Sequence, residues 1–417
     1  MTSNVFNSLR QQFPSSESLF AWLKSPEGGS LVIRDARTHP DDDHVLIHYT
    51  KESNMSLEHV GYFRSVVWNA TTNYPVCVAP TKSLPASEDE LYVVEDFIDG
   101  VMINMFWTKN GWRLATRSKL DATNTYYSRR SFASLFYDTA MAARLDFRTL
   151  DPTYTYSWVL QHPAERVVVA PSYGIPRLYL VEMRNQDFKV VRDCRNVIPA
   201  TFMHLLPKRH VLATAQEVHE RVNAWGARFG YQWKGLMVKT ELGRWKVVSQ
   251  QYMEAATLRG NSSKLPYIWL ERFSMKQLHQ YLSLYPEDTT AATNVVEAFK
   301  KCTQEAYDLY QQIYKNREFP LRDAPQKYRK LLWDIHAARA GSYFQNLVAF
   351  MNQQDTARKL WLVNYEVRYG QPSDSALNDM LDEMEGQAAV RRQEEAEEAE
   401  AAEAHEECAS TQPDSVA

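Results

Sequence analysis

The residues of this sequence best placed for chemistry are an Asp-Gly pair and the cations that follow it. Asp99 and Gly100 stand between two apolar runs, and the next run, Gly111–Lys119, ends with Arg117 and Lys119. Guanidinium and ammonium groups gathered at one site bind phosphate. Each feature also has a simpler interpretation. Asp-Gly between alternating apolar residues is a strong hairpin signal, and a lone exposed cation is usually only solvated.

Alternating and helical apolar patterns indicate how these residues are positioned. Period-two alternation predicts strands at Val45–Tyr49, Tyr62–Asn69 and Val76–Val78 before the hairpin. Helical spacing predicts helices at Tyr126–Arg144 and Ala215–Phe229 after it. These segments favour a mixed fold, in which short antiparallel strands carry the Asp-Gly turn and helices cover the sheets.

After Pro266 the pattern changes to helical periodicity, which predicts helices at 295–314, 327–340 and 343–351. The expected organisation follows from this change. It comprises a lead-in at 1–44, an α/β domain at 45–265, a helical domain at 266–372 and an acidic tail at 373–417.

The charge of the chain is unevenly distributed. From residue 376 onward there are thirteen acidic residues and two arginines, whereas the formal net charge of the whole chain is −4, so the remainder carries about +7. A basic body favours a polyanionic partner through phosphate contacts, although ordinary surface charge explains the excess equally well. The tail is expected to be solvated or disordered; alternatively, it occupies the basic groove as a polyanion mimic.

The cysteines and apolar runs favour a protein of a reducing compartment. Cys77, Cys194, Cys302 and Cys408 are widely spread and form no CxxC pair or disulfide framework. The apolar runs are too short to span a bilayer, and the first ten residues contain no apolar signal core. We therefore expect a cytoplasmic protein without a membrane partner.

Five motifs in a fixed order resemble those of the covalent nucleotidyltransferases, the family of ATP-dependent RNA ligases and capping enzymes. The corresponding segments are Gly61–Asn69 with Ala79–Ser83, Glu95–Lys119, Tyr156–Val169, Arg177–Glu182 and Trp233–Tyr252. The resemblance covers roughly residues 45–265. The helical C-terminal domain points to the phage-type RNA ligase branch. The chain is also similar to RNA-ligase-like proteins of large DNA viruses, which have this Asp-Gly-x-Met-Ile-Asn pattern and Gln-His-Pro turn.

The resemblance implies an α+β fold of the ligase nucleotidyltransferase type, with antiparallel sheets lining a nucleotide groove, followed by an all-α C-terminal domain. It implies ATP as the nucleotide, Mg²⁺ if the protein is active, and RNA or another nucleic acid as partner. A viral protein would act in the host cytoplasm or the virion. The implied nucleotide-binding residues are Arg64, Lys82, Asp99, Gly100, Arg117, Lys119, Tyr179, Gly235, Lys239 and Lys246.

The chain departs from the family at the residues that carry the chemistry. In the active enzymes, the lysine of a Lys-x-Asp-Gly motif attacks the α-phosphorus of ATP. Here Phe97 stands at the lysine position, and Val159 and Lys234 stand where the family has acidic residues. An aromatic ring cannot attack phosphorus. Together with the loss of the two acidic residues, this substitution indicates an adenylation centre that no longer catalyses the reaction. Lys82 and Lys119 are the candidates for a relocated nucleophile.

Three hypotheses therefore remain. The first is a protein that binds nucleotide or RNA ends without self-adenylation. The second is an active ATP-dependent RNA ligase that uses a relocated lysine. The third is a structural or scaffold protein that retains only the fold.

Overall fold

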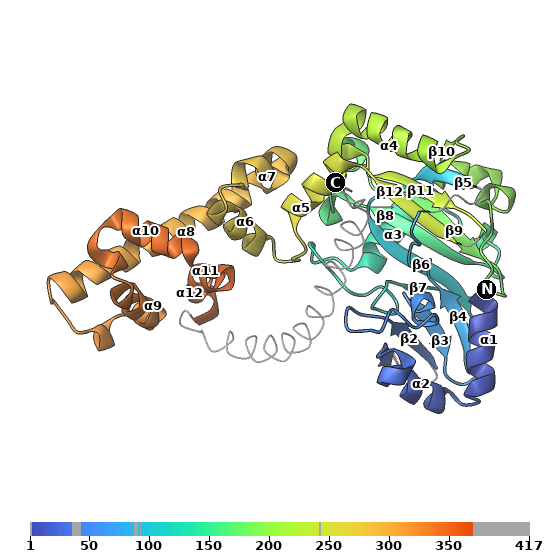
Figure 1. The fold of residues 1–417 in the computed structure, drawn as a ribbon, viewed down its shortest axis with the longest axis horizontal. Coiled ribbons are helices and arrows are strands. Elements are labelled where there is room, and N and C mark those ends of the chain that lie inside the picture. Colours follow the sequence, from blue (N-terminus) through green and yellow to red (C-terminus); the bar gives the residue numbers. More distant parts are fainter. Residues whose placement is uncertain (1, 36–42, 87–90, 92, 242, 370–417) are drawn as a thin grey trace, which may run out of the picture. The chain divides into compact units, whose positions relative to one another are not determined.

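The computed structural model describes residues 2–35, 43–86, 91, 93–241 and 243–369. These residues form two compact units, of which the first ends at Thr257 and the second begins at Leu258 (Figure 1). The predicted acidic tail lies outside the described residues. Within the described part of the chain, no helix combines the length and the apolar character needed to cross a bilayer.

The first unit contains three four-stranded antiparallel sheets. Sheet A has the order β1 (Val32–Asp35), β2 (His44–His48), β3 (Val66–Asn69) and β4 (Tyr74–Val78). Sheet B has the order β10 (Arg209–His210), β5 (Val93–Asp96), β11 (Gly235–Lys239) and β12 (Arg244–Val248). Sheet C has the order β7 (Gly111–Ala115), β6 (Val101–Thr108), β8 (Thr155–Gln161) and β9 (Arg177–Arg184).

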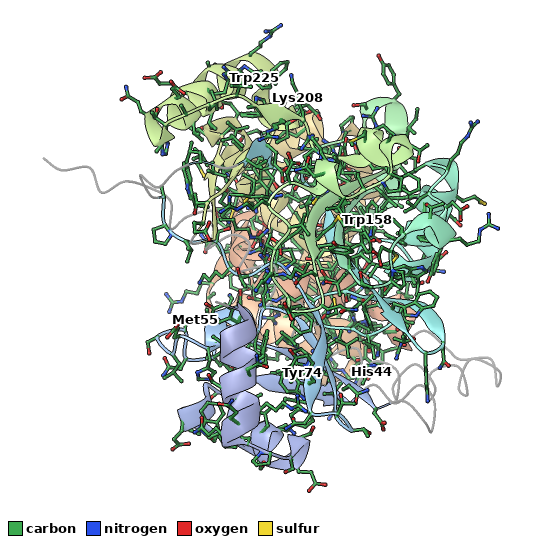
Figure 2. The ribbon with its side chains drawn as sticks, turned by 90° about the vertical axis from the view of Figure 1, so that its right-hand side faces the viewer. His44, Met55, Tyr74, Trp158, Lys208 and Trp225 are labelled. Carbon is green, nitrogen blue, oxygen red and sulfur yellow. The ribbon has the colours of Figure 1, made fainter. Side chains whose placement is uncertain are left out.

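Helices cover these sheets and complete their cores. The helices α1 (Thr2–Gln12) and α2 (Ser16–Lys24) contribute Phe6, Leu19 and Leu23 to the core of sheet A. Hence the predicted lead-in at 1–44 belongs to the first unit. Helix α3 (Phe132–Ala142) packs on sheet C, where Trp158 is fully buried (Figure 2).

Sheet B has one face covered by helix α4 (Ala215–Phe229), and this arrangement determines which residues face away from the helix. Val94, Leu236, Val238 and Trp245 form one apolar cluster with Ala215, Val218 and Val222 of the helix. Because side chains alternate along a strand, Glu95, Met237, Lys239 and Lys246 lie on the opposite face. Phe97, which follows β5 directly, continues the parity of Glu95.

The second unit is entirely helical in its described residues. Its helices are α6 (Leu265–Ser274), α7 (Leu278–Leu284), α8 (Thr289–Tyr310), α9 (Gln326–Ala337), α10 (Phe344–Gln353), α11 (Thr356–Val363) and α12 (Tyr365–Tyr369). They bury Leu270, Phe299, Leu331 and Leu347 in a common core. The prediction of an α+β fold with antiparallel sheets, followed by an all-α part, is therefore confirmed.

Several predicted boundaries differ from the structure. The helix expected from Tyr126 begins only at Phe132, because the Ser131 side chain caps its first turn and the preceding backbone amides bind Glu165 instead. The strand expected at Tyr62–Asn69 is confined to β3. The last ligase-like segment is a strand only to Val248, after which α5 (Gln250–Arg259) begins and extends past Thr257.

Candidate functional site

The Asp-Gly turn joins two different sheets rather than closing a hairpin. β5 of sheet B ends at Asp96 and β6 of sheet C begins at Val101, so Asp99 and Gly100 lie where the two sheets meet. Gly100 has φ 145°, and a Cβ atom there would lie 2.4 Å from the Leu160 carbonyl oxygen and 2.9 Å from Val159 Cγ1. The close approach of β8 therefore requires glycine at this position.

The carboxylate of Asp99 is almost completely buried and accepts four hydrogen bonds. Oδ2 accepts from the backbone N–H groups of Val168 and Val169, both at 2.9 Å. Oδ1 accepts from Tyr252 Oη at 2.5 Å and from Lys234 Nζ at 3.3 Å. Burial by itself would raise the pKa of Asp99, but the Lys234 ammonium and these hydrogen bonds together lower it below its ordinary value.

These contacts leave no room for a divalent cation on Asp99. Both carboxylate oxygens already accept hydrogen bonds, and the Lys234 ammonium lies 3.3 Å from Oδ1. A positive charge at that distance repels a metal ion, and Mg²⁺ requires oxygen ligands in near-octahedral geometry. The residues around Asp99 therefore do not fit the Mg²⁺ that the family resemblance implies.

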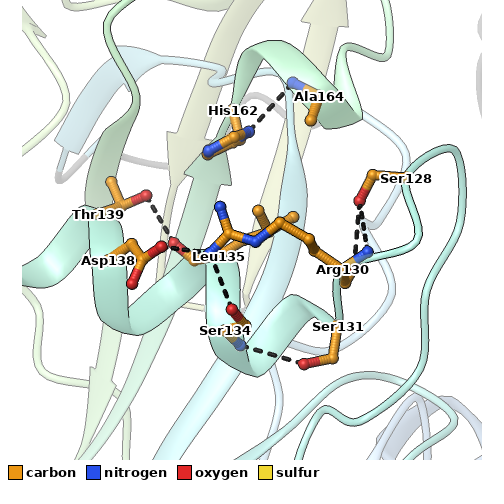
Figure 3. Close-up of polar contacts among 9 residues, drawn as sticks. All are labelled: Ser128, Arg130, Ser131, Ser134, Leu135, Asp138, Thr139, His162 and Ala164. Carbon is orange, nitrogen blue, oxygen red and sulfur yellow. Dashed lines mark hydrogen bonds and ion pairs between the residues drawn. The ribbon is translucent and has the colours of Figure 1, made fainter.

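The Gln-His-Pro turn after β8 positions the two amides that bind Asp99. His162 Nδ1 accepts a hydrogen bond from the Ala164 N–H beside the exposed Arg130 (Figure 3). Arg166 Nε donates to the Val168 carbonyl oxygen at 3.0 Å and thereby orients the following loop. Glu165, whose pKa burial raises, binds the amides of the loop before α3. The loop after β8 thus holds the Asp99 carboxylate through the Val168 and Val169 amides.

Two lysines lie against the ring of Phe97. Lys234 Nζ is 4.2 Å from the ring centroid and Lys246 Nζ is 5.8 Å from it. The Phe97 backbone N–H donates to the Gly235 carbonyl oxygen at 2.9 Å, which fixes the ring beside the start of β11. The structure therefore brings together Phe97, Asp99, Gly235 and Lys246 of the predicted site, with Gly100 at the same turn.

Lys239 lies on the same face of sheet B, but its amine binds Glu95 and Val181. Nζ is 2.6 Å from Glu95 Oε1 and donates to the Val181 carbonyl oxygen at 2.6 Å. Burial would lower the pKa of Lys239, but the neighbouring Glu95 and Glu182 carboxylates and the Cys194 thiol outweigh this and raise it. We assign Lys239 a structural role, since its ion pair joins β11 to β5 within sheet B and its hydrogen bond to Val181 of β9 links sheet B to sheet C.

Arg64, Arg117 and Lys119 lie in a second group, at the junction of sheet A with the end of β7. Arg117 donates to the Tyr49 carbonyl oxygen at 3.1 Å and stacks 4.9 Å from the Tyr49 ring centroid. Lys119 closes a tight turn with Thr116, and the hydroxyl of Ser65, next to Arg64, donates to the Thr116 carbonyl oxygen at 3.3 Å. The contact with Tyr49 therefore positions Arg117, and the bond from Ser65 holds the turn that carries Lys119.

The remaining two predicted residues lie at other edges of the first unit. Lys82 is exposed and follows Thr81, whose carbonyl oxygen accepts two hydrogen bonds from Arg244 of β12. Tyr179 pairs with Val159 across sheet C and lines a cleft of about 710 Å³ at the outer strand β9. Its predicted role of stacking on a base stays a prediction.

Sequence reasoning missed two residues that define the site. Lys234 was interpreted only as the replacement of an acidic residue, yet its amine contacts both Asp99 and the Phe97 ring. Tyr252 was placed on a strand, whereas α5 presents its hydroxyl to Asp99. The only sequence signal for the role of Lys234 was its positive charge directly before Gly235 of the predicted site. No local pattern marks Tyr252.

Comparison with solved structures finds RNA ligases. An archaeal ATP-dependent RNA ligase is similar over 88% of this chain and 99% of its own, with 14% identity and a TM-score of 0.38. A second form matches 72% of this chain at a TM-score of 0.35. The Naegleria gruberi RNA ligase with pyrophosphate is similar over 41% of this chain and 52% of its own, with 13% identity and a TM-score of 0.30.

No protein-family model and no curated relative matches the chain. The similarity to solved RNA ligases is one of architecture, at low identity and low TM-score.

Proposed function

We propose that this chain binds nucleoside triphosphates or phosphorylated RNA ends without forming a covalent adenylate. The observation that carries the proposal is the ring of Phe97 with two lysine amines against it. The ring has no lone pair with which to attack phosphorus. The amines offer N–H donors and positive charge to a phosphate group. We also propose that the protein is viral and that it acts in the host cytoplasm or in the virion.

The electrostatics beside Phe97 support binding over catalysis. Lys234 forms an ion pair with Asp99, and an ammonium has no lone pair for nucleophilic attack. Its side chain remains 18% exposed, so a phosphate can reach it from solvent. Lys246, whose Nζ lies 5.8 Å from the centroid of the same ring, can contribute a second phosphate contact. The site therefore has the features of an anion-binding site rather than those of an adenylation centre.

The second candidate function, an active ligase with a relocated lysine, is favoured by one observation. Lys234 Nζ lies 4.2 Å from the centroid of the ring that replaces the family's lysine. To act as nucleophile, this amine would have to leave Asp99 and lose a proton. Its lone pair would then form a bond to the α-phosphorus of ATP while the bond to pyrophosphate breaks. Lys234 thus joins Lys82 and Lys119 as a candidate.

Two measurements test the proposal. Intact-mass spectrometry after incubation with ATP and Mg²⁺ or Mn²⁺ should show no added AMP. Binding of ATP and of a 5′-phosphorylated RNA oligonucleotide should be measurable, with a slope of log K against log salt of about −0.7 per phosphate contact. Lys234→Met with Lys246→Met should weaken both, whereas Lys109→Met, in the exposed turn after β6, is the matched control.

The possible outcomes separate the three hypotheses. A mass increase of one AMP, mapped to Lys234, Lys82 or Lys119, would establish the relocated lysine. Salt-independent or undetectable binding of both ligands would leave only the scaffold role. Removing the chain after Gln371 should strengthen binding if the acidic tail competes for the site, and otherwise should leave binding unchanged.

A further inference from the structure

Strand β9 is an edge strand of sheet C. It pairs with β8 on one side and stands last in the order of the sheet. Near its end, the Val181 carbonyl oxygen accepts from Lys239 Nζ and the Met183 carbonyl oxygen accepts from the Val191 N–H. Within the described part of the chain, by contrast, residues 177–180 make no backbone hydrogen bond other than those of their pairing with β8. This stretch therefore offers N–H and C=O groups to another chain.

A cleft of about 710 Å³ lies along this stretch. It is lined by the end of α3, by the start of β9 with the residues before it, and by the helical turns of η7 (Ala200–Leu205). Its apolar lining includes Ile175, Leu178, Phe202 and Leu205. Clefts of this volume hold ligands of drug size, so several apolar side chains of a partner can enter it.

Apolar side chains at the rim of this cleft stay exposed. Ile175, which lines it, has 53% of its surface accessible, and Met141 and Met203, each next to a lining residue in the sequence, have 76% and 40%. Anchoring of α3 and η7 does not explain this exposure, because Phe136 and Phe202 already bury these segments in the core of sheet C. Exposed apolar groups gathered around a concave surface mark an interaction site.

The same cleft carries positive charge. Arg144, Arg177 and His204 line it, whereas none of the lining residues that the structure describes is acidic. Both arginines are exposed, and neither side chain has a hydrogen-bond or ion-pair partner among the described residues. Their guanidinium groups can therefore bind the carboxylates of a ligand.

The backbone of Arg144 adopts a left-handed conformation. Helix α3 ends at Ala142, and Arg144, two residues later, has φ 56°. Glycine or asparagine usually occupies such a position after a helix, because a larger side chain is strained there. Strained backbone is concentrated at binding sites, and here it places a guanidinium group in the lining of the cleft.

We propose that the edge of β9 binds an extended peptide of a partner protein that carries both apolar and acidic side chains. The main chain of the peptide adds a strand to sheet C along residues 177–180. Its apolar side chains enter the cleft, and its carboxylates bind Arg144 and Arg177. A peptide is favoured over a nucleic acid because it alone supplies the N–H and C=O groups that pair with a strand edge, and because the lining is mainly aliphatic. This site goes beyond the proposed nucleotide binding and does not depend on it.

The test uses three kinds of short fluorescein-labelled peptide on the full chain, in buffer without nucleotide. The first alternates Glu with Val, and the second has Lys in place of every Glu. The third is the acidic peptide N-methylated at every second amide, made once on its valines and once on its glutamates. Fluorescence anisotropy should show about ten-fold or tighter binding of the acidic peptide than of the lysine peptide. At least one of the two methylated forms should lose binding, because N-methylation removes the donors of one strand edge.

Two variants locate the binding on the chain. Arg144→Glu/Arg177→Glu should weaken binding of the acidic peptide about ten-fold and strengthen binding of the lysine peptide. Lys51→Glu/Lys109→Glu, at exposed positions of the same unit, is the matched control for the change of charge. Ile175→Ser, which changes one exposed apolar side chain, should weaken the acidic peptide and leave the preference between the two peptides intact. Circular dichroism and thermal melting check that each variant is folded.

Hydrogen exchange provides the readout for the added strand. Binding of the acidic peptide should slow the exchange of amides within residues 177–180. Equal affinity for the acidic and the lysine peptide, equal binding of both methylated forms, an equal loss in the cleft and control variants, or protection confined to other segments would each overturn the inference. If Arg144→Glu/Arg177→Glu instead weakens only a single-stranded RNA, the cleft is a nucleic-acid site and the peptide is the wrong occupant. Because these assays contain no ATP, their failure leaves the proposed nucleotide binding untouched, and failure of ATP binding leaves this site standing.

Discussion

Replacing Asp99 with asparagine tests whether the four hydrogen bonds to its carboxylate maintain the site. An asparagine can still accept from Val168 and Val169 through its carbonyl oxygen, but its NH₂ group cannot accept from Tyr252 or Lys234. Two hydrogen bonds to a buried charge are lost, so the free energy of unfolding should fall by about 3 kcal/mol. The melting temperature should fall by roughly 6–12 °C.

The dependence on pH gives this prediction a second readout. Because the pKa of Asp99 is lowered in the folded state, its stabilisation is complete above the ordinary carboxyl pKa of about 4. The stabilisation is lost as the pH falls through the lower, folded-state value. The stability difference between the unmodified chain and Asp99→Asn should therefore be constant from pH 7 to about pH 4, and should shrink below it.

Urea unfolding followed by tryptophan fluorescence and circular dichroism provides the measurement, with Tyr252→Phe and Lys234→Met as matched single-contact variants. Each should cost less than Asp99→Asn, since the carboxylate retains three donors. In the asparagine background, Lys234→Met should cost less than it does alone, because the ion pair is already absent. A loss below about 1 kcal/mol for Asp99→Asn, or strict additivity of the two changes, would refute the reasoning.

Three further predictions concern the surrounding structure. Glu95→Gln should destabilise the first unit by about 3 kcal/mol or more, because it leaves the buried Lys239 ammonium without its carboxylate. The double variant Lys239→Met/Glu95→Gln should recover part of that loss in the same urea assay. Burial lowers the pKa of the folded-state His48 to about 4, so as the pH falls the unfolded chain takes up a proton at this position before the folded chain does. The free energy of unfolding should therefore decline below about pH 6.5. His48→Gln should remove this decline in thermal melts at several pH values. Gly235→Ala should prevent soluble expression or lower the melting temperature strongly, because a Cβ atom there would lie 2.0 Å from the Val247 carbonyl oxygen at φ 146°. Gly61→Ala, with open space around its Cβ position and no positive φ, should cost far less.

The sequence allowed prediction of the features that depend on local patterns. Helical periodicity predicted α4 with both of its ends, and the change of period after Pro266 predicted the helical unit. The Asp-Gly signal correctly indicated a turn between two strands. It did not reveal that the strands belong to different sheets, because Asp-Gly specifies turn geometry and not strand pairing.

The side-chain partners within the site could not be predicted in this way. Lys234 meets Asp99 only because β11 pairs with β5 in the register that sets Leu236 opposite Asp96, and that register is set by packing on α4. The family resemblance placed Phe97 and Lys246 in one site, and the Lys246 amine lies 5.8 Å from the Phe97 ring centroid. It did not show that Lys239, on the same face, pairs with Glu95.

The anchoring of Asp99 has a consequence for the order of folding. Its partners Val168, Lys234 and Tyr252 are 69, 135 and 153 residues further along the chain. Contacts at such separation require the closure of long loops, which slows their formation. During synthesis, the carboxylate of Asp99 cannot bind its last partner, Tyr252, until that residue has left the ribosome. Its substitution should therefore accelerate unfolding more than it slows folding.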